Sequence, residues 1–505
     1  MKLFPKLPLL AGALVLTFPL LSRAADTDAL DIFDGKSLTG WDGDPRFWKV
    51  EDGCITGQTT KETPTENNTF LTWTGGELDD FELTLEYKLI GGNSGVQVRS
   101  FPLDRKWGVG GYQADFEAGD RYSGIIYGEA FRGILADRGQ KNVIGDDHKP
   151  VTKEQFGDAA ALQKAVKKED WNALKVTAKG WTIENSINGT TTASLTDEDK
   201  GMRRRGGLLA LQLHAGPPMK VQFRNVKLKR LPMGDVKKIV FIAGRPSHGR
   251  GEHEHRAGSM LLAKSLNTGA GDRFYATVYS NGWPADPTKF QNADAIIMYC
   301  DGGGGHMVNR HLPEVEAAHA RGAGVGAIHY GVEVEKGPSG DAFLKWMGGY
   351  FEMNWSVNPH WDADYKTLPQ HAVTRGVEPF KANDEWYYHM RFREGMKNVT
   401  PILTALPPKE TLSRGDGTHS GNPAVREAVL TKAEPQHMMW VSENENGSRG
   451  FGFTGAHYHR NWQDNNFRKV VLNAIAWIAK AEVPAGGIQT PTPSEEEMKA
   501  NQDKK

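Results

Sequence analysis

The pattern of apolar residues changes at one point in this 505-residue chain. Up to about residue 231, short stretches such as "DFELTLEYKL" and "SGVQVRS" alternate apolar and polar residues, as strands with one buried face do. After "PMGD" at 232–235, strongly apolar stretches such as "KKIVFIAG" and "ADAIIMYCDGG" are separated by helical ones. Because a chain of this length supports more than one core, we expect a separate domain on each side of this point.

The two patterns predict different folds. Many short strands joined by Gly, Asn and Asp turns, including the hairpin signal Asn188-Gly189, indicate an antiparallel β-sandwich over residues 30–231. Buried strands that alternate with helices predict an α/β domain over residues 236–482, with a parallel sheet and helices on both faces. The remaining segment, 483–505, is rich in proline and then in charge, so we expect a disordered tail.

The first residues have the composition of an export signal. Lys2 and Lys6 precede "LPLLAGALVLTFPLL", and "SRA" then places small residues at −3 and −1 of a cleavage site after Ala24. Residues 1–24 are therefore predicted to be a secretory signal peptide. No later segment approaches the ~20 consecutive apolar residues of a membrane helix. We expect an exported protein, periplasmic or secreted, without a membrane span in its mature form.

Charge and cysteine content exclude other classes. The formal net charge of −1 gives no basic footprint for nucleic acid. Cys54 and Cys300, the two cysteines of the chain, fall in different predicted domains, so we expect both to be unpaired and buried.

Histidine is concentrated in the second domain, where 14 of the 16 histidines lie. Open α/β sheets bind ligands at the carboxyl ends of their strands, and histidine is the commonest metal ligand. The candidate ligands at predicted strand ends and loops are His248, His253, His255, His329 and His457. They predict a site for a divalent metal, zinc or another transition metal. The "HEH" spacing lacks the i, i+4 pattern of helical zinc pairs, so hydrogen-bonded loop histidines are the alternative.

The second domain also resembles a known family. The segments "SHGRGEHEH", "DGGGGH", "AIHYG", "NDEWYYHMRF" and "GFGFTGAHYHRNW" are similar to those of the ThuA-like family, named for trehalose utilisation. The resemblance implies a flavodoxin-like fold of the class I glutamine-amidotransferase type. In glutamine amidotransferases a sharp strand-to-helix elbow presents a catalytic cysteine, and here His329 occupies that position. Imidazole does not replace a thiolate in forming the acyl intermediate, so we do not expect a glutaminase.

Three residues of this domain are candidates for chemistry on a sugar. His329 is predicted to act as a metal ligand or as a general acid or base. Glu385 is a candidate acid or base and Tyr387 a candidate sugar contact, in the segment "DEWYYHMR". The alternative for these two is a capped loop beside a core aromatic ring.

The first domain resembles another family. "IFDGKSLTGWDG", "FWKVEDGCITGQ", "GGNSGVQVRS", "GVGGYQADFEAG" and "FRGILADRGQK" are similar, in order, to the 3-keto-glucoside 1,2-lyase/3-keto-2-hydroxyglucal hydratase family, also known as 3-keto-disaccharide hydrolases. The resemblance implies a concanavalin-like jelly roll that cleaves glycosides oxidised at C3 of the sugar.

Such a reaction requires a base at C2, a stabiliser for the enolate and an acid for the leaving oxygen. In "YQADFE", a strand would place Gln113, Asp115 and Glu117 on one face, giving two neighbouring carboxylates whose pKa values can differ. The catalytic candidates of this domain are Asp115, Glu117 and His214. The substrate-binding candidates are Arg99, Tyr112, Gln113, Arg132, Arg138 and Trp107. Surface ion pairs, a strand-end histidine and a core tryptophan are the alternatives for the arginines, His214 and Trp107.

Together these features predict an exported carbohydrate-processing enzyme that acts on 3-keto-glycosides by elimination and hydration, with net hydrolysis of the glycosidic bond. Its ThuA-like domain would act on or bind related sugars. The alternative is a non-enzymatic glycan-binding protein in which the ThuA-like domain is a docking module.

Overall fold

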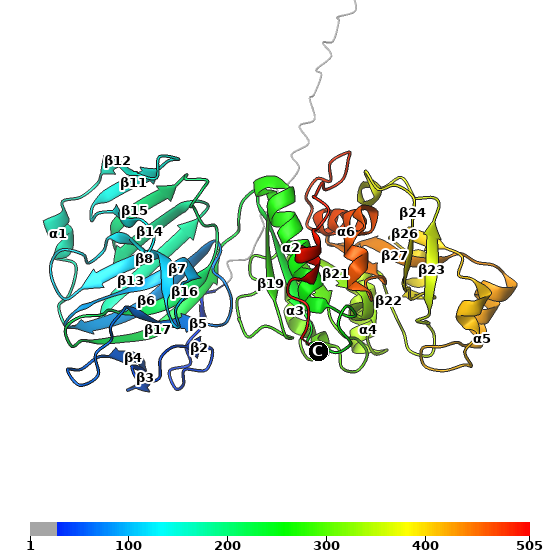
Figure 1. Cartoon of the computed structure of the whole chain (residues 1–505), viewed down its shortest axis with the longest axis horizontal. Helices are drawn as coiled ribbons and strands as arrows, with labels where there is room; N and C mark the ends of the chain where they lie inside the picture. The colour runs from blue at the N-terminus through cyan, green and yellow to red at the C-terminus, as the bar shows by residue number, and fades with distance from the viewer. Residues whose placement is uncertain (1–27, 505) are drawn as a thin grey trace, which may run out of the picture.

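The computed structural model describes residues 28–504, and Figure 1 shows two bodies side by side, one all-β and one α/β. The predicted signal peptide, residues 1–24, lies outside the described residues. Within 28–504, no helix is both long and apolar enough to cross a membrane.

The first domain is a jelly-roll sandwich, as expected. One sheet contains, in spatial order, β12 (Pro150–Gln155), β11 (Gln140–Ile144), β15 (Thr190–Asp197), β14 (Thr182–Ile187), β13 (Asn172–Lys179), β6 (Phe81–Ile90), β17 (Lys220–Arg230), β4 (Cys54–Gln58) and β3 (Trp48–Glu51), with β1 (Leu30–Asp31) paired to β17. The other contains β10 (Gly133–Ala136), β9 (Ile126–Glu129), β8 (Val109–Glu117), β7 (Asn93–Pro102), β16 (Leu208–Leu213), β5 (Thr69–Trp73) and β2 (Trp41–Asp42). The short helix α1 (Ala159–Gln163) follows β12. The rings of Tyr87 and Phe116 stack across the two sheets with centroids 3.8 Å apart, so the core lies between them.

Strand β8 shows how the alternation positions polar groups. Tyr112, Ala114 and Phe116 belong to the core cluster between the sheets. Because successive side chains point to opposite faces, Gln113 and Asp115 lie on the outer face of the second sheet. Both are nonetheless buried there, at 1% and 6% exposure.

The second domain has the expected α/β fold. Its sheet has the order β19 (Phe274–Tyr279), β18 (Lys237–Ala243), β20 (Ala295–Tyr299), β21 (Gly324–Ile328), β28 (Arg449–Phe453), β27 (Gln436–Glu443) and β26 (Val399–Ala405), of which the first five run parallel. The helices are α2 (His255–Gly269), α3 (Leu312–Ala320), α4 (Pro338–Met347), α5 (Pro423–Arg426), α6 (Asn465–Ile478) and α7 (Glu495–Lys499). Two further strand pairs are β22 (Gly349–Tyr350) with β25 (Arg391–Phe392) and β23 (His360–Tyr365) with β24 (Phe380–Glu385).

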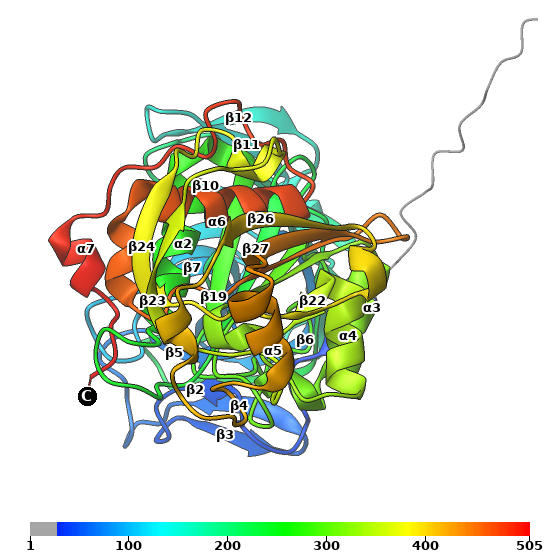
Figure 2. The ribbon, with the colours of Figure 1, turned by 90° about the vertical axis from the view of Figure 1, so that its right-hand side faces the viewer.

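Helices cover both faces of this sheet (Figure 2). Helices α2 and α6 pack on one face, against residues such as Ile239 and Ile297, while α3 and α4 pack on the other, against Val240 and Ile296. The strand order reverses at β18, since the chain leaves it through α2 to β19 on one side and later returns to β20 on the other. The loops after β18 and β20 therefore diverge, which leaves room for a ligand.

The C-terminal segment differs from its expectation. Instead of lacking structure, it is described as far as Lys504 and carries α7. Ile488 and Met498 are buried at 2% and 9% exposure, and the Met498 carbonyl lies 3.0 Å from His459 Nε2. These two apolar side chains pack this polar segment against the α/β domain. The average composition of the segment does not reveal this packing, because it depends on two individual residues.

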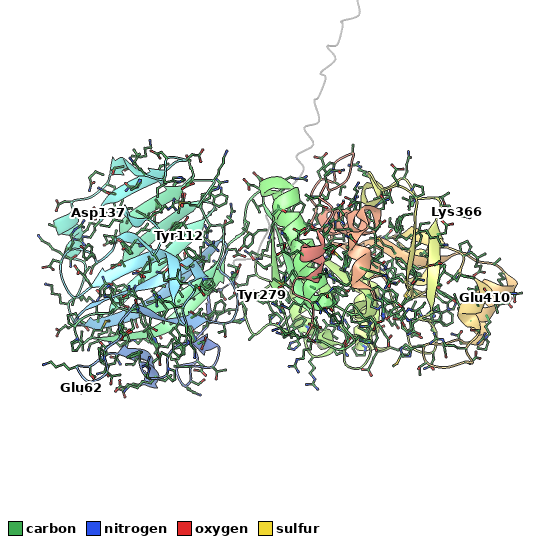
Figure 3. The ribbon with its side chains drawn as sticks, viewed as in Figure 1. Glu62, Tyr112, Asp137, Tyr279, Lys366 and Glu410 are labelled. Atoms are coloured by element: carbon green, nitrogen blue, oxygen red, sulfur yellow. The ribbon has the colours of Figure 1, made fainter. Side chains whose placement is uncertain are left out.

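The boundary between the domains contains buried charges. Arg230, at the end of the sandwich, donates to Asp286 of the α/β domain at 2.9 Å and lies 3.2 Å from Asp79 of its own domain. Lys238 Nζ lies 2.8 Å from the second oxygen of Asp79. Burial alone would raise the pKa of Asp79, but Lys238 and Arg230 together lower it to about 2. Tyr279, which donates to Asp286 at 2.7 Å, marks this boundary in Figure 3.

We expect Arg230→Met to lower the free energy of unfolding by about 3–5 kcal/mol, because it leaves the buried Asp286 carboxylate without its cation and leaves Asp79 with Lys238 alone. Urea denaturation measures the change. The matched control is Lys175→Met, which breaks the exposed 2.7 Å pair with Glu82 and should cost less than about 1 kcal/mol. Equal effects of the two substitutions would contradict the prediction.

Candidate functional site

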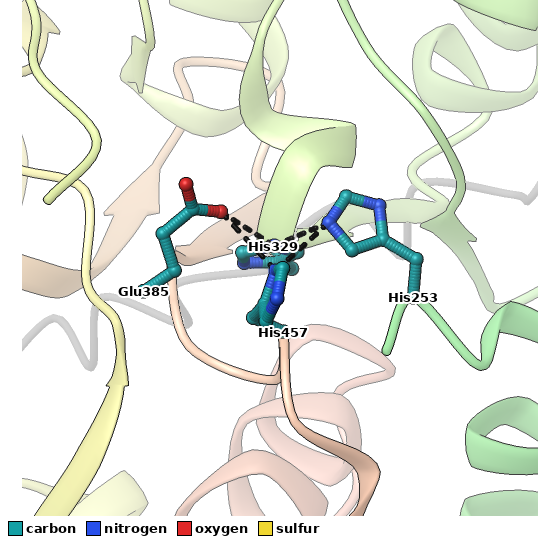
Figure 4. A group of neighbouring side chains, drawn as sticks. All are labelled: His253, His329, Glu385 and His457. Atoms are coloured by element: carbon teal, nitrogen blue, oxygen red, sulfur yellow. Dashed lines mark hydrogen bonds and ion pairs between the residues drawn. The ribbon is translucent and has the colours of Figure 1, made fainter. Parts of the chain in front are cut away.

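Four side chains from separate segments converge at the carboxyl end of the parallel sheet (Figure 4). They are His253 in the loop after β18, His329 directly after β21, Glu385 at the end of β24 and His457 in the loop after β28. One potential ligand atom from each lies within 4.8 Å of all the others. We refer to these residues as the four-ligand group.

The spacing within the four-ligand group fits a metal ion. His253 Nε2 lies 3.1 Å from His329 Nε2 and 3.0 Å from His457 Nδ1. Glu385 Oε2 lies 3.2 Å from His457 Nδ1 and 3.5 Å from His329 Nε2. Zinc binds nitrogen at about 2.0–2.1 Å, so adjacent ligand atoms of a tetrahedral site are about 3.3 Å apart. The observed separations lie on both sides of that value.

The hydrogen bonds on the far side of two rings show which nitrogens carry protons. His329 Nδ1 lies 2.8 Å from the carbonyl of Thr454, which only accepts, so this nitrogen carries the hydrogen. His253 Nδ1 lies 3.0 Å from Asp301 Oδ1. Burial holds the pKa of His253 well below its usual range. Burial alone would raise the pKa of Asp301, but the hydrogen bond with His253 lowers it. A neutral ring beside a carboxylate again places the hydrogen of His253 on Nδ1, so the lone pair of His253 Nε2 faces His329 Nε2 at 3.1 Å. A cation between them would satisfy both.

Glu385 is held in its place by neighbours. The hydroxyl of Tyr387 donates to Glu385 Oε2 at 3.2 Å and lies 3.2 Å from His329 Nε2, while Asn358 donates to Glu385 Oε1 at 3.1 Å. Burial raises the pKa of Tyr387 well above its usual range, so the phenol stays protonated. Although burial opposes it, the contact with His329 and His457 lowers the pKa of Glu385, which stays ionised.

The backbone of the ligand segments is strained. His253 and His329 have positive φ values of 46° and 53°, and Ala456, just before His457, has 84°. Non-glycine residues seldom adopt this region, and such conformations cluster at functional sites. The buried Asp384 fixes one of these segments by accepting the backbone N–H groups of Ala456 at 2.8 Å and His457 at 3.0 Å.

The other two predicted ligands lie outside the four-ligand group. His255 begins α2, and its Nδ1 lies 3.2 Å from the carbonyl of Arg245. His248 is exposed and stacks on His253 with ring centroids 3.5 Å apart. His248, His253 and Asp301 form a second group of potential ligand atoms. Asp301 was not predicted, although its position directly after the strand "AIIMYC" was a usable signal.

A second polar site lies on the outer face of the sandwich. Asp115 accepts hydrogen bonds from Asn93 at 2.8 Å and from Gln113 at 2.9 Å, and Gln113 accepts one from Gln97 at 2.7 Å. Burial raises the pKa of Asp115 to about 7, although both amide contacts oppose the rise. Gln212 completes the set, with its Oε1 3.3 Å from Gln113 Nε2. We call these residues, Asn93, Gln97, Gln113, Asp115 and Gln212, the Asp115 cluster.

Sequence reasoning found only part of the Asp115 cluster. It missed Asn93, Gln97 and Gln212. Gln97 and Gln212 are polar residues within strands of alternating pattern and so also point outward. His214 follows the same strand as Gln212, and its Nδ1 lies 2.5 Å from the carbonyl of Ala215. Trp107 lines a separate cavity of about 470 Å³, to which no residue of the Asp115 cluster contributes.

Several residues predicted for this site lie elsewhere. Glu117 accepts the backbone N–H groups of Arg121 at 2.6 Å and Tyr122 at 2.8 Å, so it fixes a loop rather than pairing with Asp115. Tyr112 faces the core between the sheets, where its hydroxyl donates to Asp197.

The three predicted arginines also have structural partners. Arg99 is buried and donates to the Asp80 carboxylate at 2.7 Å and to the carbonyl of Asp79 at 2.8 Å. Arg132 pairs with Asp197 and, at 3.1 Å, with Asp199. Arg138 donates to backbone carbonyls, including that of Ser123 at 2.6 Å. The structure thus gives each of the three arginines a partner within the protein, and their sugar-binding role stays a prediction.

Each domain matches a known family. Residues 28–229 match the family model described as 3-keto-alpha-glucoside-1,2-lyase-like domain, and residues 247–478 match the trehalose utilisation (ThuA) model. Both resemblances inferred from the sequence are thereby confirmed. The chain is therefore similar in its sandwich to a 3-keto-alpha-glucoside-1,2-lyase-like domain and in its α/β part, called the ThuA domain below, to the trehalose utilisation family.

Solved structures provide further comparisons, while no curated protein matches the chain. A putative glycosyl hydrolase from Parabacteroides distasonis is 19% identical, with 41% of this chain and 100% of that chain covered and a TM-score of 0.28. A putative ThuA-like protein from Bacteroides uniformis is 18% identical, with 48% and 91% covered and a TM-score of 0.35. The carbohydrate binding module CBM66 from Bacillus subtilis is 14% identical, with 37% and 94% covered and a TM-score of 0.26.

Proposed function

We propose that this protein is an exported enzyme that breaks down 3-keto-glycosides, with one reactive site in each domain. The observation that carries the proposal is the Asp115 cluster, in which a buried carboxylate is surrounded by amide side chains. Burial raises the pKa of Asp115 to about 7, which suits a general base at neutral pH. The amides supply donors and acceptors that match sugar oxygens.

The reaction would use these groups in two steps. The C3 ketone acidifies the C2–H bond, and the ionised Asp115 takes that proton while an amide N–H group of Gln212 stabilises the enolate oxygen. The C1–O bond then breaks, and the leaving oxygen takes a proton from a general acid, for which His214 is the candidate. Water adds across the resulting double bond, so the sum of both steps is hydrolysis.

Turnover of a defined substrate tests this proposal. The purified protein is incubated with 3-keto-trehalose or a 3-keto-glucoside, and with the same sugar unoxidised at C3. We expect release of the leaving sugar from the keto compounds alone, since only they have an acidic C2 proton. Binding of the keto sugar without turnover would refute the proposal and favour a glycan-binding protein.

For the ThuA domain we propose that the four-ligand group binds one divalent cation. Three imidazole nitrogens with one carboxylate oxygen are a donor set suited to zinc. The close approach of His253 Nε2 and His329 Nε2, 3.1 Å, supports the fit, because both nitrogens can coordinate the same cation. A bound divalent cation supplies a Lewis acid for a sugar carbonyl or hydroxyl. The chain itself fixes the ligands through Thr454, Asp301 and Asp384, and Tyr387 orients Glu385.

We expect Asp301→Asn to weaken zinc binding about 10- to 100-fold, because Asp301 holds His253 in the tautomer that presents Nε2. Competition with a chromophoric chelator measures the affinity. Asp364→Asn, an exposed position on strand β23, is the control and should leave the affinity unchanged. An unaltered affinity in Asp301→Asn would show that this carboxylate does not position the ligand.

A further inference from the structure

A cavity of about 510 Å³ lies where the strand order of the α/β sheet reverses. The loop after β18, residues 244–246, lines one side and the loop after β20, residues 300–311, lines much of the rest. Asp301 links the cavity to the four-ligand group, because the carboxylate that lines the cavity also contacts His253 Nδ1 at 3.0 Å. The cavity therefore adjoins the proposed metal site at the position where open α/β sheets bind ligands.

Two glycines allow these loops to pass closely. A Cβ on Gly244 would lie 2.8 Å from Cys300 Cβ, and a Cβ on Gly302 would lie 2.3 Å from the carbonyl oxygen of Tyr330. Any side chain at either position would push the backbones apart. Gly302, the first glycine of "DGGGG", is thus needed for the close packing of the segment that follows Asp301.

The cavity contains two guanidinium groups that lack a carboxylate partner. Arg245 and Arg310 both line it and are both exposed. Within residues 28–504 neither forms an ion pair, and Arg245 donates to the backbone carbonyl of Asn281 at 3.3 Å. Asp301, which lines the same cavity, is already engaged by His253 and by Ser247 at 2.9 Å. The two guanidinium groups therefore leave net positive charge in the cavity.

We propose that this cavity binds the negatively charged group of an acidic sugar, a carboxylate or a phosphate ester, with Arg245 and Arg310 as its partners. Guanidinium groups bind both anions through paired N–H donors. A sugar held there would direct its hydroxyl or carbonyl oxygens towards the four-ligand group. The inference rests on the proposed function of the ThuA domain and adds the substrate class to it.

Titration calorimetry on the zinc-loaded full chain tests the inference with glucuronate, glucose 6-phosphate and glucose. We expect at least one of the two anionic sugars to bind about tenfold more tightly than glucose, with a preference that falls as salt is added. Arg245→Gln and Arg310→Gln should each remove most of this preference. Lys366→Gln, which makes the same charge change at an exposed site outside the cavity, should leave it intact.

Each outcome has one meaning. A preference for glucuronate alone supports a sugar acid, and a preference for glucose 6-phosphate alone supports a phosphate ester. Equal affinities for the three sugars, or a preference that survives both arginine substitutions, overturns the inference. Zinc content is measured separately on the same samples. If the protein binds zinc but shows no anion preference, the proposed metal site stands and the inference about the cavity fails. If it prefers anions without binding zinc, the inference about the cavity stands and the proposed metal site fails.

Discussion

Replacing His329 with asparagine is expected to reduce the zinc affinity of the ThuA domain by more than about a hundredfold, because loss of a ligand exceeds the effect of losing an outer partner. His329 lies within 3.5 Å of His253, Glu385 and the hydroxyl of Tyr387, so no neighbouring side chain can take its place without moving. Asparagine is the appropriate substitution, since His329 has a φ of 53° and asparagine tolerates this backbone region better than alanine.

Elemental analysis after dialysis measures zinc per chain, and circular dichroism checks the fold. His437→Asn is the matched control, since His437 is a partly buried histidine of the same domain that contacts Thr404 at 2.9 Å and lies outside the four-ligand group. Full zinc content in His329→Asn would remove the metal site from the proposal. The alternative, a ThuA domain that serves for docking alone, would then gain support, provided that activity is also unchanged.

The α/β fold and most of the four-ligand group could be predicted because strand ends are visible in the sequence. His329 follows "GVGAI" directly, and parallel strands bring their carboxyl ends to one edge. The roles of His253 and His255 could not be separated by spacing alone. Helix α2 begins at His255, which turns that ring towards Arg245, while His253 stays in the loop and faces the other ligands.

The sandwich shows where pattern reasoning fails. The alternating pattern of β8 correctly places Tyr112 and Gln113 on opposite faces of the sheet. The face of Tyr112 is the core between the sheets, so its predicted sugar-binding role conflicted with the pattern itself. Arg99 sits at an irregularity of β7, between Val98 and Phe101, where a φ of 47° lets its side chain reach Asp80 in the interior. Such a bulge depends on pairing with a distant strand, so the sequence of β7 alone does not show it.

Replacing Asp115 with asparagine is expected to lower kcat/KM for a 3-keto-glycoside by about 10²- to 10⁴-fold, the usual contribution of a general base. The base must be ionised to take the C2 proton. Since the pKa of Asp115 is raised to about 7, kcat/KM of the natural protein should rise about tenfold per pH unit below that value and level off above it. Initial rates between about pH 5 and 9 measure this profile.

Glu117→Gln is the matched control for Asp115→Asn, because it neutralises the next outward-facing carboxylate of the same strand. Glu117 accepts two backbone N–H groups of the following loop, and its charge adds a smaller contribution to the raised pKa of Asp115. Its loss should therefore affect the loop, keep the activity and move the pH profile only slightly to lower pH. The amide introduced by Asp115→Asn has one acceptor oxygen fewer for the N–H donors of Asn93 and Gln113, so this substitution also lowers stability. Thermal denaturation of both variants therefore separates a folding defect from a catalytic one. If Asp115→Asn keeps its activity, or if the natural profile is flat through pH 7, the proton from C2 goes to another group and the sandwich loses its proposed base.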